Sequence, residues 1–131
     1  MNSITVHSGS RNEMIDITTE VQEAVDKSGV KDGYVILYVP HTTAAITINE
    51  GADPSVKHDI LSALNKLIPH DSSYRHAEGN SNAHIKSSII GCNETVLIEN
   101  GKLVLGIWQH IFFFEGDGPR TRKVYIGVFG K

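Results

Sequence analysis

Residues 34–50 of the chain read YVILYVPHTTAAITINE, and this stretch decides the fold. The apolar run Tyr34–Val39 predicts a buried strand, and Ala45–Glu50 predicts the strand that follows it. Between them lies the polar segment Pro40–Thr43. An imidazole and two hydroxyls before the second strand, and an amide and a carboxylate at its end, are more polar groups than a core needs. We therefore expect this segment to form the first wall of a functional site.

At 131 residues the chain fits one domain, residues 1–131, that is long enough to bury a core. Its 40% hydrophobic and 21% charged residues are typical of a soluble globular protein. The net charge of −3 provides no basic surface, so we expect no nucleic-acid partner. The first residues show no export signal, and no apolar run approaches the roughly 18 residues of a membrane span. With Cys92 as the single cysteine, we expect a reducing cytoplasm.

Two of the expected helices are short. Thr19 and Gln22 are spaced as in a capping box, and Gly29 ends the helix that they open. Ala83–Ile90 predicts another short helix, capped by Asn82. The chain between the last two helices is polar and long enough to suggest a functional loop.

The longest expected helix begins at Asp53, whose carboxylate can cap it, and ends before Pro69. On this helix Asp59 falls at the edge of the apolar stripe. A carboxylate there must be paired or must face a cleft. Two interpretations stay open: an ion pair with a lysine or arginine, or an acid–base or ion-binding role together with Glu50 and His41.

The remaining segments predict strands. Ser3–Ser8 and Met14–Ile17 alternate, residues 100–101 (Asn-Gly) are a strong hairpin signal, and Ile107–Glu115 is strongly hydrophobic. These elements predict an α+β fold of mostly antiparallel, sandwich-like sheets with two to three helices. The run Ile111–Phe114 is apolar on both faces, so we expect both faces to be covered, one of them by another subunit if not by this chain.

Histidines and a carboxylate cluster in the second half of the chain. His76, Glu78 and His84 offer imidazole and carboxylate groups, which are suitable ligands for zinc, magnesium or another divalent ion. Their spacing matches no defined metal motif. The alternative is that these histidines cap helices and stabilise the loop.

Basic and hydroxyl groups suggest an anion site. Lys86 and Ser87 lie near the start of the last expected helix, where free N–H groups favour anions, although the segment can also be an ordinary polar helix face. Arg120 and Arg122 can complete a pocket for an anionic substrate or, alternatively, protect a sheet edge. Cys92 has no activating neighbour in the sequence and is interpreted as a small buried residue.

The chain resembles the YjbQ family over nearly its whole length. The resemblance rests on motifs that occur in family order: His41-Thr42-Thr43-Ala44-Ala45, Asn49-Glu50, Asp53-Pro54, Val56, Asp59, Tyr74-x-His76-x-Glu78-Gly79, His84-Ile85-Lys86-Ser87-Ser88, Gly91 and Gly106-x-Trp108-Gln109. It implies a small α+β protein that forms a homotrimer around a threefold axis. The usual label of the family is secondary thiamine-phosphate synthase.

The implied reaction joins a hydroxymethylpyrimidine diphosphate to a thiazole phosphate and expels pyrophosphate. Such a reaction needs cationic groups or a divalent metal at the leaving group. The expected site residues are therefore His41, Glu50 and Asp59 for catalysis; Thr42, Thr43, Asn49, Lys86, Ser87, Trp108, Arg120 and Arg122 for substrate; and His76, Glu78 and His84 for a metal. Two other functions remain open: a metal-dependent hydrolase or phosphatase of a small phosphorylated metabolite, and a non-catalytic metal- or ligand-binding trimer.

Overall fold

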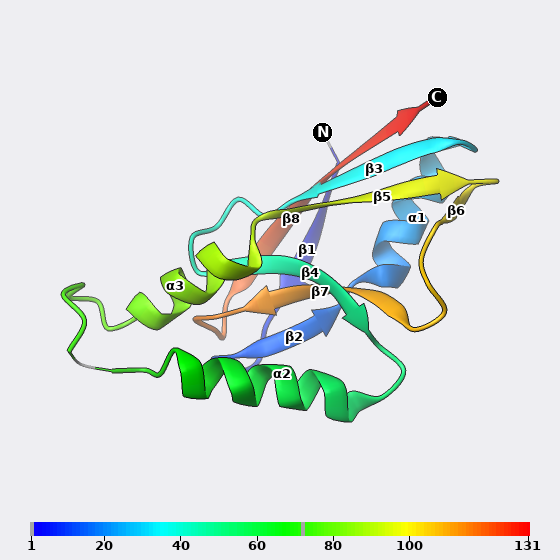
Figure 1. Ribbon diagram of the computed structural model, residues 1–131. Coiled ribbons are helices and arrows are strands. Elements are labelled where there is room, and N and C mark those ends of the chain that lie inside the picture. The colour runs from blue at the N-terminus through cyan, green and yellow to red at the C-terminus, as the bar shows by residue number, and fades with distance from the viewer. Residues whose placement is uncertain (1, 72) are drawn as a thin grey trace.

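Two antiparallel sheets form the centre of the computed structural model, which describes residues 2–71 and 73–131 (Figure 1). In the larger sheet the strand order is β1 (Asn2–His7), β8 (Thr121–Gly130), β3 (Gly33–Tyr38), β5 (Asn93–Glu99) and β6 (Lys102–Leu103). In the smaller sheet it is β2 (Glu13–Asp16), β7 (Gln109–Glu115) and β4 (Ala44–Glu50). The predicted α+β fold of mostly antiparallel sheets is confirmed.

The main core lies between the two sheets. Val35 and Leu37 on β3 pack in one cluster with Ile46 on β4 and Phe113 on β7, and all four are fully buried. Helix α1 (Thr18–Ser28) completes this cluster with its own apolar stripe. Burying each such side chain contributes about 1.5–3 kcal/mol, so this cluster is the main source of stability.

The opposite face of the smaller sheet is covered by α2 (Pro54–Leu67) and α3 (Ser81–Ile90) (Figure 1). Phe112 and Phe114 point to these helices, whereas Ile111 and Phe113 point to the main core. Both faces of the apolar run are therefore covered, as predicted. Elements of this chain cover them, so no other subunit is needed there. No helix among the described residues is long and apolar enough to cross a membrane.

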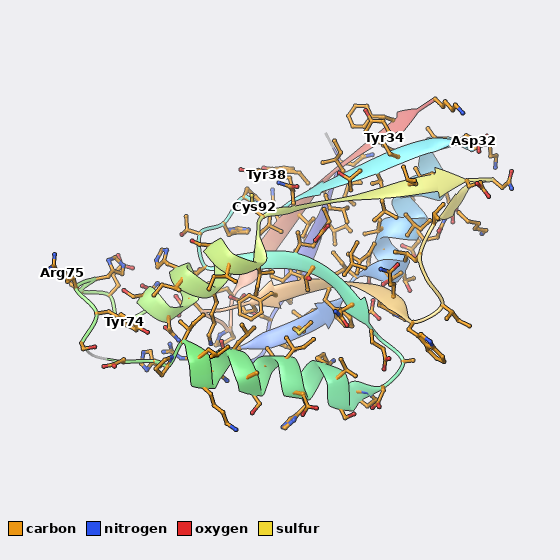
Figure 2. The ribbon with its side chains drawn as sticks, viewed as in Figure 1. Asp32, Tyr34, Tyr38, Tyr74, Arg75 and Cys92 are labelled. Atoms are coloured by element: carbon orange, nitrogen blue, oxygen red, sulfur yellow. The ribbon has the colours of Figure 1, made fainter. Side chains whose placement is uncertain are left out.

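The outer face of the larger sheet is open and apolar. Tyr34, Ile36 and Tyr38 on β3 have 40%, 37% and 47% of their surface exposed. Figure 2 labels Tyr34 and Tyr38 on this strand. Tyr34 stacks on Phe129 of β8 at a ring-centroid distance of 5.2 Å. The prediction of a fully buried strand over Tyr34–Val39 is thus wrong for alternate residues, because only one face of this sheet meets the core.

Local signals set most element boundaries. Asp53 caps α2 by accepting a hydrogen bond from the N–H of Ser55 at 2.9 Å, and Gly29 ends α1 with φ of 73°, both as predicted. The hairpin residues Asn100 and Gly101 also have positive φ, 53° and 77°. These positions are confirmed because their signals act within a few residues.

Two predicted helix starts are wrong. Helix α1 begins at Thr18 without a capping box, because Gln22 bonds instead to the carbonyl of Gly101 and the N–H of Leu103. Helix α3 begins at Ser81, and its N-cap is Asn80 rather than Asn82. In α1 a tertiary contact takes the side chain that the local pattern assigned to the cap. In α3 the predicted cap, Asn82, lies inside the helix as its second residue.

Candidate functional site

Three distant segments of the chain meet at one end of the sheets and line an open groove of about 470 Å³. We call it the histidine–arginine groove. It contains eight of the predicted site residues: His41, Thr42, Thr43, His76, Glu78, His84, Arg120 and Arg122. The segments meet because β4 begins beside the end of β7, where the N–H of Gly116 donates to the carbonyl of Thr43 at 2.9 Å.

A buried ion pair forms the floor of this groove. Arg122 donates through Nε to Glu115 at 2.9 Å and through Nη2 to the other carboxylate oxygen and to Thr43 Oγ1. Burial alone raises the pKa of Glu115. Hydrogen bonds from Arg122, from the N–H of Asp117 and from the Ser8 hydroxyl outweigh that effect and lower the pKa below its ordinary value, so the carboxylate stays charged. Arg122 lies on β8, inside the sheet, so its interpretation as edge protection is wrong.

Asp117 ties Arg120 to the start of α3. Its side chain accepts from Arg120 Nη2 and from the amide of Asn80, each at 2.9 Å. Burial raises the pKa of Asp117, and the bonds from Asn80 and Arg120 outweigh that effect and lower it. Both guanidinium groups of the groove therefore have carboxylate partners. The groove is much less positive than its two arginines alone suggest.

His41 is held in one tautomer. Its Nε2 accepts a hydrogen bond from the backbone N–H of Lys123 at 3.0 Å, so the proton of the neutral ring is on Nδ1. Burial lowers the pKa of His41, and the charge of Arg122 lowers it further. At neutral pH this imidazole is an uncharged ring whose Nδ1–H remains to donate.

His76 and His84 face each other across the groove. Their ring centroids lie 5.3 Å apart with the planes at 85°, and Glu78 Oε2 is 3.8 Å from His76 Nε2. Two imidazoles on one tetrahedral zinc ion have centroids roughly 5 Å apart, given Zn–N bonds of about 2.0–2.1 Å. Among the described residues, however, no three His, Cys, Asp or Glu side chains are grouped closely enough to hold an ion.

The start of α3 carries buried polar atoms without partners. Asn80 does not cap the helix through its side chain, because its amide nitrogen donates to Asp117. In the described part of the chain, the buried side-chain atoms that lack a hydrogen bond are Asn80 Oδ1, Asn82 Oδ1 and Ser87 Oγ. Each such atom costs about 1–3 kcal/mol if it stays unpaired. Of these three residues, Asn80 is the one that lines the groove.

A second cavity adjoins the groove. His41, Thr42 and His84 also line a hollow of about 350 Å³, which we call the Cys92 pocket. Its other lining residues are Ala44, Ser87, Ser88, Gly91 and Cys92. Cys92 lies where α3 passes into β5 (Figure 2), and its thiol is free and exposed. The prediction of a buried cysteine is wrong, because residue 92 precedes the strand instead of lying within it.

Lys86 points away from both cavities. Only 1% of its surface is exposed, and its ammonium donates to Asn12 Oδ1 at 3.1 Å and to Asn65 Oδ1. Burial lowers the pKa of Lys86, and the charge of Arg11 lowers it further. Instead of the predicted contact with substrate, Lys86 makes hydrogen bonds that join α3 to α2 and to the turn after β1.

Four other predicted residues lie outside both cavities. Glu50 and Asn49 are at the far end of β4, and the seven residues from Ala44 to Glu50 span about 20 Å. Trp108 lies in the turn before β7 and is 59% exposed. The side chain of Asp59 is 83% exposed, so it is not at the apolar edge of its helix as expected.

Some residues that line the groove or bond to its arginines were not singled out by the sequence. Glu115 and Asp117 set the charge of both arginines, and Asn80 supplies an unpaired oxygen. Asp117 lies in a Gly-Asp-Gly-Pro turn, which was a usable signal for a polar loop. Glu115 ends a hydrophobic strand, where a carboxylate that needs a partner was the corresponding signal.

Comparison with known proteins gives a consistent result. Residues 2–131 match the sequence profile of the family described as UPF0047 protein YjbQ-like. The chain is 54% identical to UPF0047 protein MJ1081 of Methanocaldococcus jannaschii over 125 residues, which cover 95% of this chain and 91% of the relative. It is 47% identical to UPF0047 protein YugU of Bacillus subtilis over 131 residues, 99% of each protein.

Solved structures agree with this likeness. A crystal structure of a yjbq/upf0047 family protein from Clostridium acetobutylicum has a TM-score of 0.96 and 50% identity, covering 98% of this chain and 100% of that one. A YbjQ-like protein of unknown function from Sulfolobus solfataricus has a TM-score of 0.95 and 34% identity, covering 99% and 96%. None of these names states a substrate or a reaction.

Proposed function

The chain belongs to the YjbQ-like UPF0047 family, and we propose on that basis that it is an enzyme that binds and transforms a small phosphorylated metabolite in the histidine–arginine groove. The observation that carries this proposal is the meeting of three histidines and two arginines, from three distant segments, on one groove. Such a set supplies hydrogen-bond donors for phosphate and groups that exchange protons near neutral pH.

The groove should attract an anion mainly through its hydrogen-bond donors, and less through its net positive charge. Glu115 and Asp117 already neutralise much of the guanidinium charge. The remaining attraction comes from the Nδ1–H of His41 and from the positive end of α3.

The specific reaction that we propose to test first is the one implied by the family resemblance. It joins a hydroxymethylpyrimidine diphosphate to a thiazole phosphate and releases pyrophosphate. The donors of the groove fit the charge that develops on a leaving diphosphate. Trp108 lies outside the groove of its own chain, so the aromatic contact expected from it has no support within one subunit.

A metal-dependent hydrolase or phosphatase is the second candidate. The observation that favours it is the 5.3 Å separation of the His76 and His84 rings, which suits two ligands of one ion. The carboxylate of Glu78, 3.8 Å from His76 Nε2, is the group we propose for a third position. Imidazole ligands favour zinc over magnesium, so zinc is the ion we propose for this alternative.

We also propose a homotrimer. The support is the exposed apolar face of the larger sheet, to which Tyr34, Ile36, Tyr38, Leu97 and Phe129 contribute. A contiguous apolar face of this kind is typical of an interaction surface. The free, exposed thiol of Cys92 fits the reducing cytoplasm that we propose as the location.

The test measures product formation from the pyrimidine diphosphate and the thiazole phosphate by the wild type and by His41→Ala, with His58→Ala as a surface control. His58 has 81% of its side chain exposed and lies outside the groove. We expect His41→Ala to reduce the rate at least tenfold and His58→Ala to leave it unchanged. Equal rates in all three proteins would remove the groove from the reaction.

Metal analysis and mass measurement separate the remaining candidates. Phosphatase activity that is lost on chelation and restored by zinc would support the hydrolase. Tyr38→Glu places a charge on the open sheet face, so it should convert the trimer to smaller species in light scattering. A protein that binds metal or phosphate but turns over neither substrate class would support the non-catalytic binding trimer.

A further inference from the structure

We infer that a second copy of this chain completes the histidine–arginine groove by placing over it the residues Gly106–Gln109, which we call the Trp108 turn. In this arrangement Trp108 of one copy forms an apolar wall of its neighbour's groove. The inference rests on the proposed function, a homotrimer with its site in the groove. It adds which two surfaces meet between the copies and which residue crosses from one copy to the site of the next.

The Trp108 turn presents two large apolar side chains to solvent. Ile107 is 85% exposed and Trp108 is 59% exposed. The turn is held firmly, because the N–H of Gln109 donates to the carbonyl of Gly106 at 3.0 Å and the side chain of Gln109 accepts from the N–H of Gly106 at 2.8 Å. The N–H of Gly51 also donates to the carbonyl of Trp108 at 2.9 Å, which ties the turn to the end of β4. A tryptophan that is exposed on a firmly held turn is well suited to anchor a protein interface.

The groove lacks the apolar surface that small-molecule sites usually have. None of the described residues that line it is a phenylalanine, tyrosine or tryptophan, and most of them are polar or charged. Small-molecule sites are lined mainly by apolar and aromatic side chains, with a few polar groups that fix the orientation of the ligand. The flat rings of the proposed substrates therefore have no aromatic surface to stack on within one chain. The indole of another copy supplies that surface.

The positions of the two surfaces fit a ring of three copies. In a ring with threefold symmetry each copy uses two different surfaces, one toward each neighbour. The Trp108 turn and the groove lie at opposite ends of the smaller sheet (Figure 1), separated by the length of β4, about 20 Å. A single chain therefore does not bring Trp108 to its own groove, whereas a head-to-tail contact brings it to the groove of the next copy.

Unpaired charges of opposite sign flank the two surfaces. Glu50 is paired across the strands with the last residue of the Trp108 turn, and it accepts a hydrogen bond from the N–H of Asp53. At the groove, Arg75 precedes one of the histidines in the sequence, and the backbone of Lys123 bonds to another. None of these four side chains has an ion-pair partner among the described residues. Opposite charges favour the encounter of the two surfaces and help to fix their orientation.

Crosslinking through the single cysteine of the chain tests this contact directly. Cys92 lines the pocket that adjoins the groove, and Ile107→Cys adds a second thiol in the turn while Trp108 is kept. A short bismaleimide should then join the copies into covalent dimers and trimers on a denaturing gel. These products should disappear in Cys92→Ser/Ile107→Cys. Glu23→Cys, at an exposed position of α1, is the matched control and should give at least tenfold less product.

Mixing two variants tests whether Trp108 acts on the groove of its neighbour. His41→Ala damages the groove and Trp108→Ala damages the turn, so neither variant alone should bind thiazole phosphate with the affinity of the wild type. When the two are co-expressed in equal amounts, about one site in four combines an intact groove from one copy with an intact turn from the next. Calorimetry should therefore find about one quarter of the wild-type number of high-affinity sites. A site built from one chain would recover none.

The outcomes separate this inference from the proposed function. If light scattering shows a trimer and Ile107→Cys gives no crosslinked product, or if Trp108→Ala binds as the wild type does, the shared groove is overturned and the proposed function stands. A monomer in light scattering overturns the homotrimer and this inference together. Failure of the wild type to bind thiazole phosphate overturns the proposed substrate, and the crosslinking result still decides the contact. Crosslinking that depends on Cys92, with recovery of about one quarter of the sites, supports the shared groove.

Discussion

Arg122 on β8 and Glu115 on β7 form a buried ion pair that joins the larger sheet to the smaller one, and the two side chains are only 6% and 0% exposed. The pair also holds Thr43 at the floor of the histidine–arginine groove. A charge in this position is stable only with its partner present. The same contact therefore supports both the fold and the shape of the site.

Removing one member of this pair should strongly destabilise the folded protein. Arg122→Met leaves the Glu115 carboxylate buried without its cation, and we expect a loss of about 3–5 kcal/mol in the free energy of unfolding. The double variant Arg122→Met/Glu115→Gln should recover much of that loss, because no charge is left buried. Urea unfolding of the wild type and the two variants measures both effects. A single variant as stable as the wild type contradicts the assignment.

Ser87 and Ser8 are both buried, but replacing them with alanine should change the stability of the protein in opposite directions. Ser87 Oγ has no partner, so Ser87→Ala should be neutral or stabilise the ligand-free protein by up to about 1 kcal/mol. The Ser8 hydroxyl donates to Glu115 at 2.7 Å and accepts from the N–H of Arg120 at 2.8 Å. Ser8→Ala should therefore destabilise the protein by about 1–3 kcal/mol. Thermal unfolding of the two variants side by side is the measurement, and the opposite order contradicts it.

Lys86 should give stability a dependence on alkaline pH. Its folded pKa lies below its ordinary value of about 10.4, so between those two pH values the unfolded chain binds more protons than the folded one. The free energy of unfolding should consequently rise as the pH increases toward 10.4. Lys86→Met should lose this rise, and Lys66→Met, at an exposed position of α2, should keep it. Urea titrations from pH 7 to pH 10 make the comparison, and identical curves for both variants would exclude Lys86 as the source.

The tautomer of His41 can be observed directly. Nitrogen NMR of the ¹⁵N-labelled protein should show the proton of its neutral ring on Nδ1 and an accepting Nε2. Because burial and then Arg122 lower its pKa, its protonation midpoint should lie below about 6.5, the ordinary value for histidine. The signal is assigned by its absence in His41→Gln. A proton on Nε2 at neutral pH would contradict the bond to Lys123.

The elements that were predicted correctly are those with local signals. Asp53 and Pro54 mark the start of α2 within the helix itself, and Asn100-Gly101 forms its turn from backbone preferences alone. The start of α3 was misplaced at Asn82, because the residue at its N-cap, Asn80, makes no side-chain cap bond that a local pattern would reveal. The side chain of Asn80 bonds instead to Asp117, 37 positions away, and no window of local sequence contains that contact.

The site was predicted in its chemistry and only partly in its geometry. His41, His76 and His84 were recognised by residue type, and the fold brings them to one groove. Glu50 was grouped with His41 because the two residues are near in sequence. In the structure they lie at opposite ends of β4, which is seven residues long. Lys86 was assigned to the substrate because its charge suits phosphate near the start of a helix, but two asparagine oxygens give its ammonium internal partners.

The bond that fixes His41 comes from the backbone of Lys123 rather than from a side chain. During evolutionary drift, position 123 can accept almost any amino acid without changing which nitrogen of His41 carries the proton. Proline is the exception, since it has no N–H to donate. The tautomer of His41 therefore depends on the backbone of β8 and not on the side chain at position 123. Relatives whose sequences diverge at this position can keep the same imidazole chemistry.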